Sequence, residues 1–172
     1  MNTFVLFVAQ GFGIGRVPKA PGTFGTLLGF VWFAVMIAIT GVINRGIGTY
    51  LVLMIASIFA SVWFCGRAEQ LLGAKDPGSV VLDEVVAIPV CYLPWLWNVL
   101  QHSPHHHAYV RDFFNSRVIL WSVLIFVLFR VFDIWKPWPI RQLQNLPGGW
   151  GVTVDDIVAA IYVAMITIPF VS

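Results

Sequence analysis

Charged residues are scarce in this chain of 172 residues: only 10% are Asp, Glu, Lys or Arg, whereas 59% are hydrophobic. Soluble domains carry about 25% charged residues, so this composition excludes an ordinary soluble domain. The apolar segments are continuous rather than alternating, which excludes a transmembrane β-barrel. The sequence therefore predicts an all-α, polytopic integral membrane helical bundle that forms a single domain over residues 1–172.

Cysteine is also rare, and its spacing excludes two kinds of site. Cys65 and Cys91 lie inside apolar stretches without CxxC spacing, so neither a disulfide nor a zinc site is expected. No secretory signal peptide is expected either, because the apolar stretch Phe4–Ala9 is short and no basic residue precedes it. Met1–Gly11 is instead predicted to form an interfacial or re-entrant helix.

Long apolar segments dominate the rest of the chain, and five of them approach the ~20 residues that cross a bilayer. They are Phe24–Ile43, Gly46–Gly66, Val80–Leu100, Phe113–Phe132 and Val154–Val171. Five spans place seven basic residues on the side of the N-terminus and three on the other, which together make the 10 Lys and Arg. The positive-inside rule therefore predicts a cytoplasmic N-terminus. The expected location of this multi-pass protein is the cell inner membrane.

The acidic residues are distributed even more unevenly than the basic ones. Seven of the 8 fall at the predicted cytoplasmic ends of the spans, and Asp112 alone falls on the other side. Acidic residues contribute little to topology, and carboxylates beside hydrocarbon are usually kept for a function. This distribution indicates a cytoplasmic site for a charged, metal-bridged substrate.

A segment rich in glycine and proline, Gly11–Thr26, precedes the first span. Its backbone N–H groups, followed by the expected start of a helix near Thr23, are suited to binding an anion. It is not a Walker loop, because no GK[ST] follows. Taken alone, the segment is explained more simply as a loop that leads into the membrane.

Two adjacent carboxylates, Asp83 and Glu84, stand near the start of the third predicted span, after a turn at Asp76–Ser79. Neighbouring side chains on a helix point about 100° apart, so one carboxylate can bind a metal while the other orients water. Hard oxygen ligands near phosphate suit Mg²⁺. Two acids favoured by the dipole of a helix N-terminus are an equally good interpretation.

Three basic residues and one acidic residue lie along Phe129–Arg141. Arg130 and Asp133 are three residues apart and are expected to share a helix face. Lys136 and Arg141 are suited to holding a phosphate, Arg in a bidentate manner. An amphipathic linker anchored at the interface is the alternative, but it gives no reason for an acid at the edge of the hydrocarbon.

A second pair of carboxylates, Asp155 and Asp156, is predicted to open the last span, with Thr153 as its N-cap. The preceding glycines at 148–151 are interpreted as a mobile loop. The stretch His102–His107 falls on the opposite predicted face, so a solvated loop or an adventitious metal contact is expected there.

Together these motifs resemble the phosphatidylglycerophosphatase A family over about Gly11 to Tyr162. The resemblance rests on the order and spacing of four stretches, which are Gly11–Gly15 with Pro21–Thr26, Asp76–Glu84, Phe129–Arg141, and Gly148-Gly149 with Gly151–Asp156. It implies a Mg²⁺-dependent membrane phosphatase that converts phosphatidylglycerophosphate to phosphatidylglycerol and phosphate.

The resemblance also implies roles for particular residues. The implied metal ligands are Asp83, Glu84, Asp133, Asp155 and Asp156, and the catalytic residues are Asp83, Glu84, Asp133 and Asp156. The implied substrate-binding residues are Arg130, Lys136, Arg141, Gly22, Thr23 and Thr26. The expected partners are a phospholipid substrate and membrane lipids but no nucleic acid, and homo-oligomerisation is left open.

Several alternatives remain open on the sequence alone. No Ser/His/Asp or Cys/His arrangement supports a covalent triad, so water activated by metal is expected, with Glu84 or Asp156 as the base. A phospho-aspartate at Asp83 or Asp133 is the other mechanism. A small transporter or ion-coupled protein would use the same carboxylates, although such sites normally lie near the bilayer midplane, and a scaffold would need no acidic cluster.

Overall fold

The computed structural model describes residues 2–43, 46–102, 110–113 and 115–170, and every regular element in these ranges is helical. The elements in chain order are α1 (Asn2–Ala9), η1 (Gly11–Arg16), α2 (Pro21–Ile43), α3 (Gly46–Leu72), α4 (Leu82–Cys91), α5 (Leu93–His102), α6 (Val110–Phe113), α7 (Ser116–Trp135), α8 (Ile140–Leu143), α9 (Gly149–Thr167) and η2 (Ile168–Phe170). The predicted all-α bundle is confirmed, and the chain is a membrane protein.

Four helices are long and apolar enough to cross a membrane. They occupy Pro21–Ile43, Ile47–Leu72, Ser116–Trp135 and Gly149–Phe170. Their positions agree with four of the five predicted spans, although the helices begin or end a few residues away from the predicted limits. The first helix begins at Pro21 rather than Phe24 because proline is well suited to the first position of a helix.

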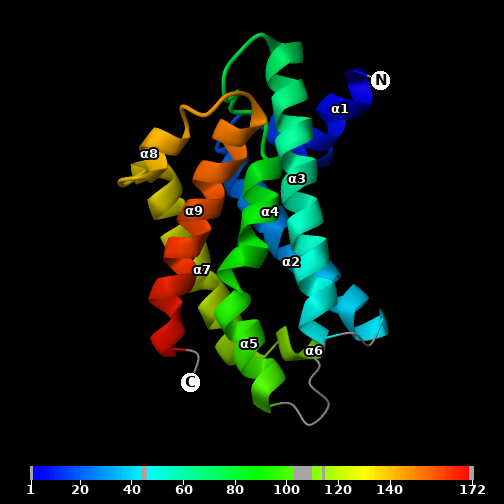
Figure 1. Ribbon diagram of the computed structural model, residues 1–172, viewed down its shortest axis with the longest axis vertical. Coiled ribbons are helices and arrows are strands. Elements are labelled where there is room, and N and C mark those ends of the chain that lie inside the picture. Colours follow the sequence, from blue (N-terminus) through cyan, green and yellow to red (C-terminus); the bar gives the residue numbers. More distant parts are fainter. Residues whose placement is uncertain (1, 44–45, 103–109, 114, 171–172) are drawn as a thin grey trace.

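The third predicted span, Val80–Leu100, differs from a continuous helix. It forms two helices of ten residues each, α4 and α5, which are separated at Tyr92. Pro94 has no N–H to donate to the carbonyl four residues earlier, and the Tyr92 N–H turns back to the Pro89 carbonyl at 3.3 Å. Figure 1 shows α4 and α5 following one another along the long axis of the molecule, so this segment is a broken helix.

Helix α9 begins earlier than expected. The prediction of a mobile loop at 148–151 is wrong, because Gly149 starts the helix and only Gly148, at φ 56°, precedes it. A Cβ atom on Gly149 would lie 1.8 Å from the Val62 carbonyl oxygen, so this glycine allows α9 to approach α3 closely. Thr153 is therefore not an N-cap: it lies inside α9, where its hydroxyl is 3.1 Å from that of Ser61.

The arrangement of the helices gathers four of their ends on one side of the bundle. Helix α4 is central and packs against α2, α3 and α9. In Figure 1, the starts of α2, α4 and α9 and the end of α7 lie in the upper half, together with α1 and α8, whereas α5 and α6 lie at the lower end. The short α1 packs against α3, as the Phe4–Phe64 ring contact illustrates.

Candidate functional site

A polar cavity of about 270 Å³ lies between the gathered ends of α2, α4, α7 and α9. We call it the acidic cavity and define it by its ionisable lining residues Asp76, Asp83, Glu84, Arg130, Asp133, Lys136, Asp155 and Asp156. All five carboxylates implied as metal ligands therefore share one cavity, although they come from three helices. With six carboxylates and two cations, the lining has a formal excess of four negative charges.

The two carboxylates of α4 lie in its first turn, and both side chains are buried. Asp155 and Asp156 lie in the second turn of α9 and are also buried, at 1% and 3% exposure. Burying a carboxylate is costly unless it is paired with a cation or hydrogen-bonded. The contacts of these four acids therefore indicate which kind of ligand the cavity can bind.

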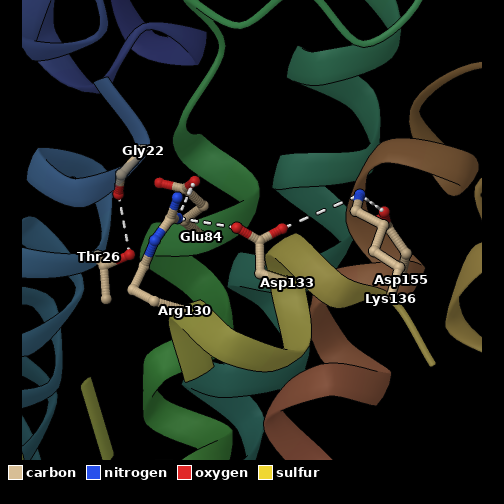
Figure 2. A network of polar contacts seen from close by, with 7 residues as sticks. All are labelled: Gly22, Thr26, Glu84, Arg130, Asp133, Lys136 and Asp155. Atoms are coloured by element: carbon tan, nitrogen blue, oxygen red, sulfur yellow. Dashed lines mark hydrogen bonds and ion pairs between the residues drawn. The ribbon is translucent and has the colours of Figure 1, made fainter. Parts of the chain in front are cut away.

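A network of ion pairs joins α4, α7 and α9 across the cavity (Figure 2). Arg130 donates through Nη1 to Glu84 Oε1 and pairs with Asp133 Oδ2, each at 2.8 Å. Lys136 Nζ lies 2.6 Å from Asp155 Oδ2 and 3.9 Å from Asp133 Oδ1. The predicted pairing of Arg130 and Asp133 on one face of a helix is confirmed, and Asp133 links the two cations.

Lys136 is well placed to remain a cation. It follows the last residue of α7 in a left-handed conformation, at φ 47°. Burial lowers the pKa of its ammonium group, but the hydrogen bond from that group to Asp155 and the charges of Asp155, Asp156 and Asp133 outweigh burial, so the pKa is raised above its usual value. The cavity therefore keeps a positive charge beside its acids.

Four buried carboxylate oxygens in the cavity have no hydrogen-bond partner among the described residues. They are Asp83 Oδ1, Glu84 Oε2, Asp155 Oδ1 and Asp156 Oδ2. Such oxygens are the ligands that a hard divalent cation prefers, so the donor set fits Mg²⁺. In the part of the chain that the structure describes, no three His, Cys, Asp or Glu form a ready-made metal site. Mg²⁺ commonly uses only one or two carboxylates, with waters and substrate phosphate completing its shell.

Glycine on α2 lets the backbone form one wall of the cavity. A Cβ atom on Gly22 would lie 2.1 Å from Glu84 Oε1 and 2.9 Å from Arg130 Nη1. A Cβ atom on Gly25 would lie 2.3 Å from Glu84 Oε2. Any side chain at either position would displace the Glu84 carboxylate, so these glycines fix the distance between α2 and the ion-pair network.

Three of the predicted substrate-binding residues lie outside the lining of the cavity. Thr26 is buried and donates its hydroxyl to the Gly22 carbonyl at 2.9 Å, as Figure 2 shows, so that donor is already used. Thr23 lies in the first turn of α2, where its backbone N–H bonds to the Ala20 carbonyl. Arg141 lies on α8 and is exposed. Gly22, Arg130 and Lys136 do line the cavity.

Asp76 lines the cavity but was not among the predicted site residues. Its backbone has φ 46°, its N–H bonds to Glu69 Oε1 at 2.8 Å, and its Oδ2 accepts a hydrogen bond from Gln144 at 2.9 Å. The turn Asp76–Ser79, which precedes Asp83 in the sequence, was the signal that could have identified Asp76. Gly15 packs against this turn at the Ser79 carbonyl.

Among the described residues, His102, Cys65 and Cys91 are not part of the lining of the acidic cavity. His102 ends α5, at the opposite end of the bundle (Figure 1), and bonds to the Asn98 carbonyl. His105, His106 and His107 lie outside the described residues. Cys65 and Cys91 are free and buried in the hydrophobic core.

The fold and the cavity together define an integral membrane protein with a buried, acidic site at one end of a helical bundle. The sequence model of the phosphatidylglycerophosphatase A family matches residues 7–171 of the chain. The chain therefore belongs to the phosphatidylglycerophosphatase A family. It is an enzyme, a phosphatase that acts on a phosphate monoester of a phospholipid, and the resemblance found in its motifs is confirmed.

Individual relatives agree over nearly the whole chain. It is 31% identical to phosphatidylglycerophosphatase A of Haemophilus influenzae over 160 residues, which cover 92% of this chain and 83% of that protein. The corresponding enzyme of Escherichia coli is 32% identical over 155 residues, or 90% and 76% of the two chains. A putative phosphatidylinositol-3-phosphatase of Bacteroides thetaiotaomicron is 33% identical over 158 residues, or 91% and 87%. No solved structure matches the chain.

Proposed function

We propose that this phosphatase hydrolyses phosphatidylglycerophosphate to phosphatidylglycerol and phosphate, with Mg²⁺ as its cofactor. The observation that carries the proposal is the set of four buried, unpartnered carboxylate oxygens beside two cations in one cavity. Cationic groups and a metal both promote hydrolysis of a phosphate monoester, because the negative charge of the phosphate resists the approach of a nucleophile. The names of the relatives from H. influenzae and E. coli support the choice of headgroup.

The metal would be bound by the acids that have a carboxylate oxygen without a hydrogen-bond partner. Asp83, Glu84, Asp155 and Asp156 each have one, whereas both oxygens of Asp133 face a cation. We therefore propose Asp83, Asp156 and the free oxygens of Glu84 and Asp155 as ligands, and we assign Asp133 to holding Arg130 and Lys136. A bound Mg²⁺ supplies Lewis-acid polarisation of the phosphate and a lower pKa for water.

Arg130 and Lys136 would bind the phosphoryl group of the substrate. The guanidinium of Arg130 presents several donors in one plane, and its observed bonds to Glu84 and Asp133 use only Nη1. The remaining donors can meet phosphate oxygens without breaking the network. Lys136 adds a point charge at the other side of Asp133. Together they would offset the charge on the phosphoryl group during transfer.

The contacts also separate the two candidate bases. Glu84 is held by Arg130, which makes it a weaker proton acceptor than an equally buried carboxylate with no cation beside it. Asp156 pairs with no Lys or Arg within the described ranges. We therefore propose that Asp156 accepts the proton of the attacking water through the carboxylate oxygen that does not hold the metal.

Direct attack by water and attack by a carboxylate can be told apart by trapping. Asp83 is the better candidate nucleophile of the two considered, since Asp133 is engaged by both cations. Excess enzyme would be mixed with substrate carrying a radioactive phosphate and quenched in acid within one turnover. Direct attack leaves the protein unlabelled, whereas a label that hydroxylamine removes would show an acyl phosphate and overturn it.

The proposed reaction is tested by release of phosphate from phosphatidylglycerophosphate in detergent micelles. EDTA should abolish release, and excess Mg²⁺ should restore it. Phosphatidylinositol 3-phosphate serves as the competing substrate, because one relative carries that activity in its name. Faster turnover of this lipid would overturn the proposed headgroup, and turnover that persists in EDTA would overturn the proposed metal.

We also propose that the acidic cavity faces the cytoplasm from the inner membrane, as the distribution of basic residues suggests. Lys75 is exposed next to Asp76, whereas both native cysteines are buried. A Lys75→Cys variant should therefore react with a membrane-impermeant maleimide in inverted vesicles and not in intact spheroplasts. Labelling in intact spheroplasts alone would reverse the proposed orientation.

A further inference from the structure

An apolar groove of about 380 Å³ lies beside the acidic cavity on the surface of the bundle. Its walls are Leu27 and Phe30 of α2 and Ile119, Val123 and Phe126 of α7, and Phe113 of α6 closes one end. Leu27, Ile119 and Val123 are 48%, 50% and 56% exposed, so the groove opens sideways toward lipid. We call it the α2–α7 groove.

The two helices that form the groove also form a wall of the acidic cavity. Gly22 and Arg130 line the cavity, and Figure 2 shows the Arg130 side chain directed toward Gly22 and Glu84. At 1.5 Å per residue, Leu27 lies about 7 Å further along α2 than Gly22, and Phe126 about 6 Å back along α7 from Arg130. The groove therefore begins roughly one helical turn from the phosphate-binding cations.

Its length and chemistry match an acyl chain. From Arg130 to Ile119 the distance along α7 is about 16 Å, close to half of the ~30 Å hydrocarbon core and therefore to one leaflet. Ser122, the polar residue of the lining, already donates its hydroxyl to the Val118 carbonyl at 2.8 Å and contacts the Tyr92 hydroxyl. The groove thus offers carbon surface along its length.

On its other side, α2 packs against α4 and leaves no space there for a lipid chain. Gly25 and Gly29 bring α2 against α4 so closely that a Cβ atom on Gly29 would lie 2.6 Å from Ile88. If the phosphate of a lipid occupies the acidic cavity, its acyl chain can therefore extend along α7 but not between α2 and α4. We propose that the α2–α7 groove binds one acyl chain of the phospholipid substrate and so aligns its phosphate with Arg130.

This inference rests on the proposed function, because it takes a phospholipid phosphate monoester as the substrate. The acyl chain gains little by moving from lipid to an equally apolar groove, so the benefit is orientation rather than transfer from water. A reacting group that is displaced by about 1 Å can lose up to 10²-fold in rate. Filling the groove should therefore impair long-chain substrates more than short-chain ones.

The test compares dipalmitoyl and dihexanoyl phosphatidylglycerophosphate in the same detergent micelles. Val123→Trp and Leu27→Trp fill the groove from its two walls, and Val127→Trp is the matched control on α7, at a residue 49% exposed that does not line the groove. The long-to-short ratio of kcat/KM should fall at least about tenfold in both groove variants. It should stay within about twofold of wild type in the control. Equal ratios in Val123→Trp and Val127→Trp would overturn the inference.

A second measurement separates failure of the groove from failure of the proposed reaction. If the wild-type enzyme hydrolyses neither lipid, the proposed function fails and the groove is judged by binding. A phospholipid phosphate monoester with a diazirine in its acyl chain should crosslink to the groove. Unlabelled phosphate monoester should displace it more effectively than phosphatidylcholine. Equal displacement by both lipids would mean that bulk lipid alone fills the groove, and would overturn the inference.

Discussion

The two ends of the bundle are held together by different means. At the cavity end, α2 meets α4 through glycines, and buried acids are joined to Arg130 and Lys136. At the other end, aromatic rings fill the space between α2, α5 and α6: Phe33 stacks on Tyr92 with ring centroids 3.9 Å apart and meets three more rings edge to face. The break between α4 and α5, at Tyr92, lies within this aromatic cluster.

This difference suggests a division of labour. Aromatic packing contributes free energy of unfolding directly, whereas buried carboxylates without partners cost free energy and are kept for chemistry. Substitutions at the cavity end should therefore change turnover far more than stability, and substitutions at the aromatic end should do the opposite. Each of the following variants tests that separation.

Removing one unpartnered charge should give the largest loss of turnover. In Asp83→Asn, a buried oxygen without a hydrogen-bond partner loses its charge, so phosphate release should fall at least about a hundredfold. Repulsion among the acids also falls, so membrane insertion and thermal stability should be preserved. Asp133→Asn should be equally inactive, because Arg130 and Lys136 lose their shared partner.

The control for these variants is Asp112→Asn, on α6 at the aromatic end. Initial rates of phosphate release and thermal unfolding in detergent should be measured on the same preparations. If Asp83→Asn retained turnover comparable to Asp112→Asn, the acidic cavity would not be the site of the reaction.

A methyl group on the backbone wall should give the next largest effect. Gly22→Ala would push a Cβ atom into the Glu84 carboxylate and Arg130, so turnover should fall at least about tenfold by displacement of the cavity groups. Gly48→Ala on α3 is the matched control, because a Cβ atom there meets nothing within 4 Å. That control should leave turnover unchanged and stabilise the helix by up to about 1 kcal/mol.

The close contact of Gly22 with Glu84 and Arg130 is a feature of the site that the sequence alone does not predict. The apolar runs indicate α2, α3, α7 and α9, and the one-sided distribution of acids indicates that the carboxylates converge. The pairing of acids with cations depends on how helices pack: Lys136 meets Asp155 and Arg130 meets Glu84, 19 and 46 residues apart in the sequence. No local pattern encodes such contacts.

The same limit explains features that the structure adds to the sequence analysis. Thr26 is predicted to bind substrate, and in the structure its hydroxyl donates to the carbonyl four residues earlier in the helix. The glycines at 148–151 were expected to be mobile, because glycine is typical of loops. The close contact of Gly149 with α3 is a tertiary feature that overrides that propensity.

At the aromatic end, Phe33→Leu should lower stability without lowering turnover per folded molecule. Phe33 is fully buried against Tyr92, and losing its ring contacts should cost about 1–2 kcal/mol of the free energy of unfolding. Thermal unfolding in detergent and the specific activity of the folded fraction measure the two quantities. A selective loss of specific activity would show that the two ends are coupled through α4.

The smallest effect is expected for His102→Ala, at the last residue of α5. This side chain is exposed and, among the residues that the structure describes, bonds to the Asn98 carbonyl of its own helix. Exposed substitutions of this kind usually change free energies by less than about 0.5 kcal/mol. Turnover should therefore stay within about twofold of wild type, and the sequence predicts the same for His105→Ala. The decisive measurement is phosphate release at saturating Mg²⁺. A loss near that of Asp83→Asn would place essential chemistry at the end of the bundle that holds no acidic cavity, and the separation of the two ends would fail.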